Sequence, residues 1–314
     1  MGLFARNKKT VGWMSIVLHD NGIQACHVKR LPQAMPVVEW VSFFPASATD
    51  EPLARLAKET HAERYACTTL LAPSEYQLLS VEAPVVPREE LKTAIRWKLK
   101  DMLDFHVDDA TIDVLDVPVD KDAPVRTRSM YAVAARNQVI EQRQAMFAGA
   151  KIPLVAIDIP DLAQRNISAL LEPEGRGLAL LSFDRDGGLL TVTYGGELYL
   201  SRRIDVGLSQ IMQAADDDLG NLFDKITLEL QRSLDHFDRQ YHFITLSKLL
   251  LAPLEGKAGR LQSYLASNLY TTVESFALES VFDIAKVPGL QSPEMQQQYF
   301  FALGAALRFE ETVL

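Results

Sequence analysis

The chain has 314 residues, which is long for one simple core and sufficient for two lobes or several subdomains. Hydrophobic residues make up 48% of it and charged residues 23%, as in ordinary globular proteins. The formal net charge of −9 argues against general nucleic-acid binding, which needs a basic surface, and no apolar run reaches the length of about 18 residues expected of a membrane span.

The cysteines and histidines show no metal-binding pattern. Cys26 and Cys67 are the two cysteines, and they form no CxxC pair. They are predicted to be reduced and buried, since a disulfide would require them to lie adjacent in the fold. His236 and His242 are six residues apart, which does not put both on one face of a helix. No metal site is therefore expected.

The first segment is predicted to begin with three strands, at residues 11–18, 23–28 and 37–44. The first two are joined by the turn His19-Asp20-Asn21-Gly22. Asn-Gly between two apolar runs predicts a tight hairpin, because both residues tolerate a positive φ. A helix at 51–63, with Pro52 in its first turn, and a strand at 66–71 complete the segment.

The second segment is predicted to be another α/β unit. Pro87, Glu89 and Glu90 suit the first turn of a helix. Apolar residues then recur at intervals of three and four up to residue 103, which predicts an amphipathic helix: Leu91, Ala94, Ile95, Leu99, Met102 and Leu103. The other elements expected here are strands at 78–81, 111–117, 130–135 and 154–159 and helices at 139–148 and 161–171.

The third segment follows a linker at 172–177 and repeats the pattern of the first. Asp216-Asp217-Asp218 is expected to be a solvated break between two helices. The expected elements are strands at 178–183, 189–194 and 198–204, helices at 208–215 and 219–239, a strand at 243–246, a helix at 257–269, a strand at 272–276, and a closing helix at 292–308 or two short ones.

This order of elements indicates an internal duplication. Each half begins with a three-stranded meander followed by a helix, and an α/β unit interrupts the first half. The pattern predicts an α/β protein with two related lobes and a cleft between them.

Five stretches resemble, in order along the chain, the PilM-like family of type IV pilus assembly proteins within the actin-like ATPase superfamily. They are LKTAIRWKLKDMLDF at 91–105, VAIDI at 155–159, RRIDVG at 202–207, LELQRSLDHF at 228–237 and YFFALGAALR at 299–308. Within the family, this low-glycine version is most similar to the one from the assembly machinery of mannose-sensitive haemagglutinin (MSHA) pili.

The resemblance implies a fold and a division into domains. The fold is an actin-like (ribonuclease H-like) two-lobed α/β fold with an inserted α/β subdomain and a degenerate nucleotide cleft. The expected domains are a first lobe at 1–72, completed by 154–174 and 299–314, an inserted subdomain at 73–153, and a second lobe at 175–298.

The resemblance also implies three nucleotide loops, and the sequence departs from each. Val17 stands where an aspartate organises Mg²⁺, and His19 where a glycine admits phosphate. In the second loop a serine replaces the aspartate, and an aspartate, whose carboxylate repels phosphate, replaces the glycine. In the third, the SKLL stretch at 247–250 replaces adenosine-binding glycines. The degenerate cleft positions are Val17, His19, Ser182, Asp184, Gly207, Ser247, Lys248 and Gly304.

These departures predict a pseudo-ATPase rather than an enzyme, with no catalytic residues and no cofactor. A one-step shift of the alignment could bring Asp20 or Asp186 into an aspartate position, but it would not restore the third loop. Binding of ATP with Mg²⁺ stays open as the alternative.

The resemblance implies a cytoplasmic scaffold, peripheral at the bacterial inner membrane. Its expected partner is the cytoplasmic N-terminal tail of a bitopic PilN-like inner-membrane protein, whose extended backbone could add to a strand edge. The groove for this tail is expected between the first lobe and the inserted subdomain, and its candidate residues are Leu78, Leu91, Ile95, Trp97, Leu99, Leu103 and Met130.

Other partners and functions stay open on the sequence alone. An acidic patch at Asp101, Asp104, Asp108 and Asp109 is either solvated surface or a docking site for a basic partner. The pilus assembly ATPase and a second copy of the chain are further candidate partners. The alternative functions are an active actin-like ATPase or sugar-kinase-like phosphotransferase, and a cytoplasmic GspL-like component of type II secretion, a family that normally continues into a membrane span.

Overall fold

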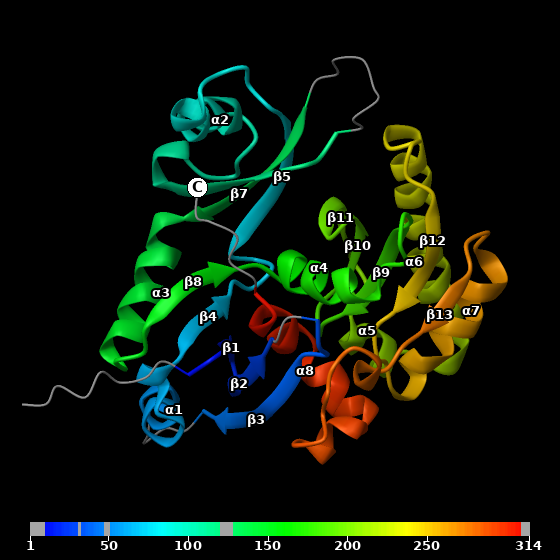
Figure 1. The fold of residues 1–314 in the computed structure, drawn as a ribbon. Coiled ribbons are helices and arrows are strands. Elements are labelled where there is room, and N and C mark those ends of the chain that lie inside the picture. The colour runs from blue at the N-terminus through cyan, green and yellow to red at the C-terminus, as the bar shows by residue number, and fades with distance from the viewer. Residues whose placement is uncertain (1–9, 31–32, 47–50, 120–127, 309–314) are drawn as a thin grey trace, which may run out of the picture. The chain divides into compact units, whose positions relative to one another are not determined.

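The computed structural model describes residues 10–30, 33–46, 51–119 and 128–308 (Figure 1). Contacts within the chain divide it into two compact units. The first unit comprises Met1–Ala25 and Phe43–Pro160, and the second comprises Cys26–Ser42 and Asp161–Leu314. The three-part division into domains expected from the sequence is finer than this one and stays a prediction.

Three sheets contain the strands of the described residues. Their strands are β1 (Trp13–His19), β2 (Gly22–Lys29), β3 (Val37–Pro45), β4 (Ala66–Leu70), β5 (Tyr76–Glu82), β6 (Ala110–Asp116), β7 (Ser129–Arg136), β8 (Leu154–Asp158), β9 (Gly177–Phe183), β10 (Gly188–Tyr194), β11 (Glu197–Ile204), β12 (Leu246–Leu251) and β13 (Val273–Ser275).

Two of the sheets have the same strand order, which is the duplication that the sequence predicts. One has the order β3-β2-β1-β4-β8 and the other β11-β10-β9-β12-β13. In both, three consecutive strands lie together and two later strands extend the sheet by parallel pairing. The third sheet, β5-β7-β6, is antiparallel.

The helices mostly begin where the sequence signals a start. Ser292 caps α8 by accepting a hydrogen bond from the Met295 N–H at 3.2 Å. Among the described residues, no helix is long and apolar enough to cross a bilayer. The helices are α1 (Pro52–Thr60), α2 (Leu91–Leu99), α3 (Asn137–Gly149), α4 (Pro160–Leu171), α5 (Leu208–Gln213), α6 (Asp216–Gln240), α7 (Leu261–Asn268) and α8 (Pro293–Ala306).

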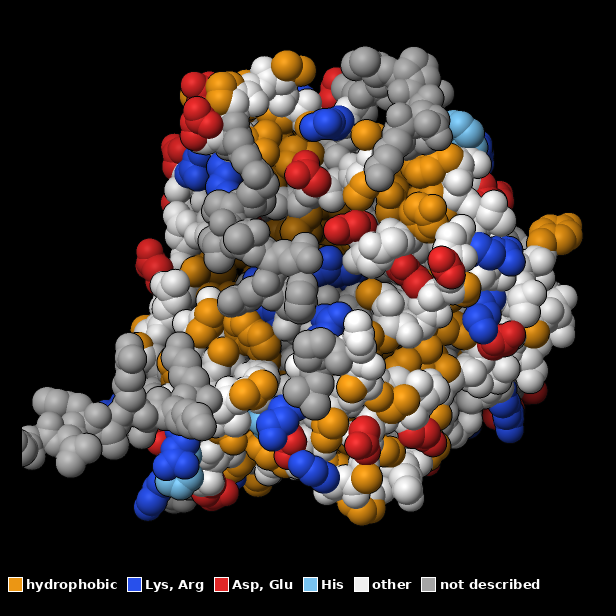
Figure 2. All heavy atoms as spheres, viewed as in Figure 1, with side chains coloured by type: hydrophobic (Ala, Val, Ile, Leu, Met, Phe, Trp, Pro, Cys, Tyr) orange, Lys and Arg blue, Asp and Glu red, His pale blue; other side chains and the backbone are white. Residues whose placement is uncertain are grey.

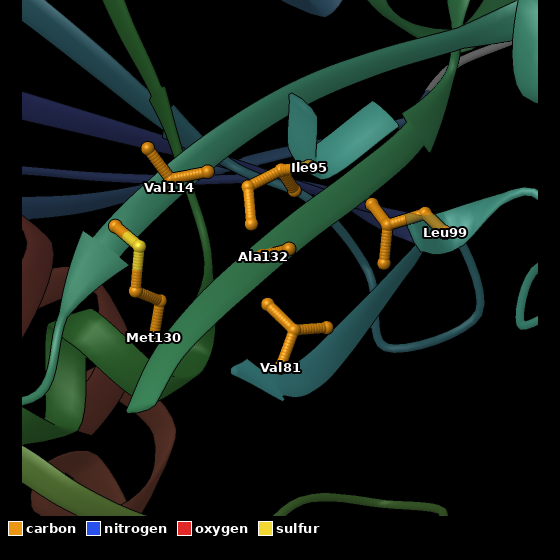
Figure 3. Packing of buried hydrophobic residues seen from close by; sticks show 6 residues of the cluster. All are labelled: Val81, Ile95, Leu99, Val114, Met130 and Ala132. Carbon is orange, nitrogen blue, oxygen red and sulfur yellow. The ribbon is translucent and has the colours of Figure 1, made fainter. Parts of the chain in front are cut away.

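In the first unit, α2 covers one face of the β5-β7-β6 sheet (Figure 1). Side chains from the helix and all three strands point toward one another and form a core (Figure 3). Burying each large aliphatic side chain stabilises the fold by roughly 1.5–3 kcal/mol. The buried members of this core are Val81, Ile95, Leu99, Val114, Met130 and Ala132.

The hairpin between β1 and β2 forms, but its turn differs from the expected one. β1 ends at His19 and β2 begins at Gly22, so Asp20 and Asn21 form the turn. Asn21 lacks the positive φ that the Asn-Gly pattern predicts, whereas Gly22 has a φ of 151°. Glycine is needed there because a Cβ would lie 2.4 Å from the carbonyl oxygen of Phe44.

Three further expectations about elements are wrong. The helix predicted up to residue 103 ends at Leu99, and the chain continues in turns. The strand predicted at 243–246 occupies Leu246–Leu251 instead, because Leu249, Leu250 and Leu251 are the residues buried between β9 and β13. The three aspartates from Asp216 are no break but the first turn of α6, where negative charge is favourable beside the helix dipole.

Candidate functional site

A cavity of about 270 Å³ lies within the first unit. Most of its lining is apolar, and three lining residues are polar: Thr111, Asp113 and Gln144. The lining residues come from β6, β7, α3, β8 and the segments next to β4 and β8: Leu71, Thr111, Asp113, Val133, Ala135, Ile140, Gln144, Leu154, Val155, Ala156, Ile157 and Ile159.

The strands meet this cavity in two different ways. β6 and β7 contribute alternate residues, Thr111 with Asp113 and Val133 with Ala135, so they present one face of their sheet. β8 contributes four consecutive residues, 154–157. Consecutive residues of a strand share a side only along its backbone edge, so the cavity follows the edge of β8.

This edge of β8 is available for pairing. β8 is the last strand of its sheet, and β4 is its one strand neighbour among the described residues. The carbonyl of Asp158 accepts from the N–H of Leu71, which follows β4. Because backbone groups alternate in direction along a strand, the N–H and C=O groups of Ile157, next to Asp158, are directed to the free edge. Val155 is 54% exposed.

An acidic rim lies at the β6 side of the cavity. Asp108 and Asp109 precede β6, and Asp113 lies on its cavity-facing side; all three are exposed. Figure 2 shows acidic side chains near the α2 region of Figure 1. Some of this negative charge is balanced by cations. Arg96 Nη2 lies 3.6 Å from Asp108 Oδ1, and Lys92 Nζ lies 2.9 Å from Asp113 Oδ1.

A buried arginine holds the connection from β4 to β5 against α3. One guanidinium nitrogen of Arg143, Nη2, donates to both carboxylate oxygens of Glu75 at 2.9 and 2.7 Å, and Nη1 donates to the Leu70 carbonyl. Glu75 also accepts from the Ala72 N–H at 2.7 Å. Charge-assisted bonds of this kind are stronger than neutral ones. They fix α3, whose Ile140 and Gln144 line the cavity.

The groove residues expected from the sequence occupy three environments. Ile95, Leu99 and Met130 were expected to line a groove, but they are buried in the core beneath α2 and are not available to a partner. The pattern that selected them was the apolar face of the helix, which packs inward. Leu91 and Leu103 pack against the same core.

The remaining two expected groove residues are different. Trp97 is 72% exposed, on the outward side of α2, and does not line the cavity. Leu78 lies opposite Val133 across the sheet, and Val133 lies opposite Asp113. Leu78 is therefore on the cavity-facing side of the sheet, as side chains directly opposite share a face.

The first expected nucleotide loop is a plain strand end in the structure. Val17 and His19 are both within β1, and His19, its last residue, is exposed. Neither side chain offers the oxygen ligand that Mg²⁺ prefers.

The polar groups of the second expected loop form hydrogen bonds within the loop and with its neighbours. The Asp184 carboxylate accepts from the N–H groups of Asp186 at 2.9 Å and Gly187 at 2.7 Å and from the Arg203 guanidinium at 2.8 Å. At the start of α5, the N–H groups of Leu208 and Ser209 donate to the carbonyls of Asp184 and Arg185. The backbone N–H groups that could otherwise bind a phosphate therefore already donate hydrogen bonds within the protein.

Two neighbouring positions reinforce this closed turn. A Cβ at Gly207 would lie 2.4 Å from the Arg185 carbonyl oxygen, so α5 begins directly against the turn. Ser182 is buried, and its hydroxyl bonds to Gln164 Oε1 at 2.5 Å. Gln164 in turn donates to the carbonyls of Leu180 and Leu189, which fixes α4 on the sheet.

The third expected loop is absent from its predicted place. Ser247 and Lys248 lie in β12, not in a loop, because the leucines after them pair and pack inside the sheet. Ser247 donates to the Gly177 carbonyl, and Lys248 pairs with Glu274 at 2.6 Å. Gly304 lies in α8 where it meets α4, and a Cβ there would be 2.3 Å from the Ala163 carbonyl oxygen.

Sequence reasoning missed the residues that define the cavity, Asp113, Val155 and Ile157. In the sequence, β8 is a short apolar run. Such a run is typical of a buried strand and does not indicate whether one edge of the strand is free. Asp113 alternates with apolar residues in β6, which a half-exposed strand explains equally well.

Comparisons with known proteins identify the fold. No family model and no curated protein matches the sequence. A solved PilM-PilN type IV pilus biogenesis complex matches with a TM-score of 0.72 and 20% identity, over 95% of this chain and 98% of that one. The cytoplasmic domain of EpsL, an inner-membrane component of the type II secretion system of Vibrio cholerae, matches at 17% identity over 66% and 76%, with a TM-score of 0.43.

A third match is a Bacteroides thetaiotaomicron protein with an actin-like ATPase fold and unknown function, at 10% identity over 93% and 99% and a TM-score of 0.48. The predicted α/β fold of the actin-like class is confirmed by the first match together with the repeated strand order of the two large sheets.

Proposed function

We propose that this chain is a scaffold of a type IV pilus assembly platform that binds the cytoplasmic N-terminal tail of a bitopic, PilN-like inner-membrane protein. The observation that carries the proposal is the free edge of β8 beside a small apolar cavity. The structure with the same fold is described as a complex of PilM with PilN, which supports a partner of this kind.

The geometry suits an extended peptide. A tail that pairs with the outward N–H and C=O groups of Ile157 would extend the sheet by one strand. Alternate side chains of the tail would then point to the apolar face formed by Val133 and Ala135. The volume of about 270 Å³ lies below the roughly 300–1,000 Å³ typical of small-molecule sites, which favours a few side chains over a nucleotide.

A titration tests this proposal. A fluorescent synthetic peptide copying the cytoplasmic tail of the PilN-like protein of the same organism should bind the full chain, with a change in anisotropy that saturates. Two further versions of this peptide are methylated at every second backbone nitrogen, one at the odd and one at the even positions. One of the two should fail to bind, because β-pairing uses alternate amides. No binding at tens of micromolar would count against the proposal.

A pair of variants separates backbone pairing from side-chain contact. Ile157→Pro removes the outward N–H, and an edge strand tolerates proline where its N–H faces away from the sheet. Ile157→Val keeps the N–H and the β-branched shape. We expect the proline variant to lose binding and the valine variant to retain it, with circular dichroism showing that both are folded.

We propose further that the chain does not hydrolyse ATP. The support is the closed turn at Asp184, whose carboxylate occupies the N–H groups of its own loop, and the lack of an oxygen ligand at Val17. An ATP phosphate brought to this turn would meet the aspartate rather than free N–H groups. Binding of Mg-ATP would stabilise the native state, so a clear rise of the melting temperature with Mg-ATP would revive the ATPase reading.

The finer predictions belong to this proposal as well. Within the PilM-like group, the chain is proposed to be the MSHA pilus biogenesis protein MshI, held at the inner membrane through its partner. Contact with the pilus assembly ATPase and self-association stay predictions, which co-purification and light scattering would test.

A further inference from the structure

One acidic side chain stands out at the cavity. Asp113 is the one charged residue among the described residues that line it. It lies on β6 directly opposite Val133, whose side chain lines the same cavity. The carboxylate therefore sits on the same sheet face as the apolar surface, at a strand that forms the sheet's edge.

The present partners of Asp113 leave it able to bind another cation. Its Oδ1 accepts from the Val114 N–H at 3.0 Å and lies 2.9 Å from Lys92 Nζ. The side chains of Lys92 and Asp113 are 58% and 72% exposed, so the pair is solvated and easily exchanged. Among the described residues, Oδ2 has no hydrogen-bond or ion-pair partner.

The chemistry of the proposed partner fits this carboxylate. Cytoplasmic segments next to a membrane span carry an excess of lysine and arginine. A tail paired with the β8 edge would pass the β6 rim, where Asp108, Asp109 and Asp113 are all exposed and acidic.

We infer that Asp113 is a specificity-determining residue of the cavity, which selects tails that place a lysine or arginine beside their apolar residues. The inference rests on the proposed function and deepens it. The incoming cation displaces Lys92 and takes both carboxylate oxygens, and Lys92 acts as a competitor for the same site.

Three conservative variants test the assignment with the tail peptide described above. Asp113→Asn should weaken binding about three- to ten-fold and flatten its dependence on salt, since one screened charge pair is lost. Lys92→Gln should tighten binding, because the competing cation is removed. Asp116→Asn is the matched control: it lies on the same strand, is exposed and carries the same charge, but lies on the face opposite Asp113. It should leave the affinity within about two-fold.

A charge exchange identifies the paired residue. Each lysine or arginine of the peptide is replaced in turn by glutamate, and each peptide is titrated against the wild type and Asp113→Lys. One substitution should weaken binding to the wild type and restore binding to Asp113→Lys. Equal effects of Asp113→Asn and Asp116→Asn, or no restoring pair, would overturn the inference while tail binding by the wild type still stood. Failure of the wild type to bind any tail would instead remove the proposed function itself.

Discussion

Two aspartates of the chain differ in their surroundings, and we assign them different roles. The Asp184 carboxylate has three donors around it, two backbone N–H groups and the Arg203 guanidinium, all from its own unit. A carboxylate satisfied in this way closes a turn and has little left to offer a ligand. Asp113 has one oxygen without a partner among the described residues and stands at the rim of an apolar cavity. The number of hydrogen-bond and ion-pair partners and the position in the fold, more than the residue type, distinguish the two carboxylates.

The close contact of α8 with α4 depends on a glycine. A Cβ at Gly304 would lie 2.3 Å from the carbonyl oxygen and 2.8 Å from the carbonyl carbon of Ala163, and Asn166 also donates to the Gly304 carbonyl at 3.0 Å. We expect Gly304→Ala to lower the free energy of unfolding by about 1–3 kcal/mol, because backbone must shift to make room. Urea unfolding followed by circular dichroism measures the change.

Gly220 is the matched control for this substitution. It also lies inside a helix, α6, but a Cβ there would meet nothing within 4 Å. Gly220→Ala should therefore raise stability by about 0.5–1 kcal/mol through helix propensity. Similar losses from both alanine variants would contradict the close packing at Gly304.

The buried thiols should be inert in the native protein. Burial raises the pKa of Cys67 to about 12, so its reactive thiolate is scarce at pH 8, and Cys26 is fully buried. Because the pKa is higher in the folded state than in the unfolded one, this group's stabilising contribution is complete below about pH 8.5 and is lost as pH rises toward 12. Ellman's reagent at pH 8 should detect neither thiol in the native chain and both after denaturation. Fast native labelling would show that the thiols are exposed.

At the scale of elements, the sequence was informative wherever apolar periodicity and burial agreed. The meanders β1–β3 and β9–β11 were predicted nearly to the residue, because short apolar runs separated by turns that contain glycine or proline have few other solutions. The errors arose where either of two neighbouring apolar runs could form the strand. Phe243 and Ile244 suggested a strand, but Phe243 packs beside Tyr241 and the leucines that follow enter the sheet.

The candidate site was harder to predict than the elements. Its cavity needs β6 and β8 to border the same space, although almost forty residues separate them. A free strand edge also has no signature in a single sequence, because it is defined by a neighbour that is missing. The resemblance to a known family pointed to the segment that contains α2, but most of the groove residues it selected pack in the core beneath this helix.

The two sides of α2 should respond differently to truncation. Ile95 is fully buried in the core of the β5-β7-β6 sheet, so Ile95→Ala should cost about 2–5 kcal/mol of unfolding free energy. Trp97, two residues on, is 72% exposed, and Trp97→Ala should change stability by less than about 0.5 kcal/mol. Chemical denaturation of the two variants measures both changes. The dependence of the unfolding free energy on denaturant concentration should be equal in the two. A large loss at Trp97 would mean that the outer side of α2 is covered in the native protein.

At the scale of the whole molecule, two sheets share one strand order but differ in their surroundings. The β3-β2-β1-β4-β8 sheet ends in a strand edge that borders a cavity, whereas the β11-β10-β9-β12-β13 sheet bears a turn whose donors are consumed internally. The strand order of the two sheets is the same although their loops differ, because strand pairing and helix packing do not depend on those loops.

Hydrogen exchange across the whole chain can examine both halves in one experiment. With the tail peptide bound, exchange of the Ile157 amide should slow strongly, because pairing at the edge gives its N–H a carbonyl acceptor. The amides of Asp186 and Gly187 should exchange equally with and without Mg-ATP, since they already donate to Asp184. Protection by Mg-ATP at this turn would restore a nucleotide role to the second unit. Protection by the peptide along β5 or β13 in place of β8 would move the binding edge to another strand.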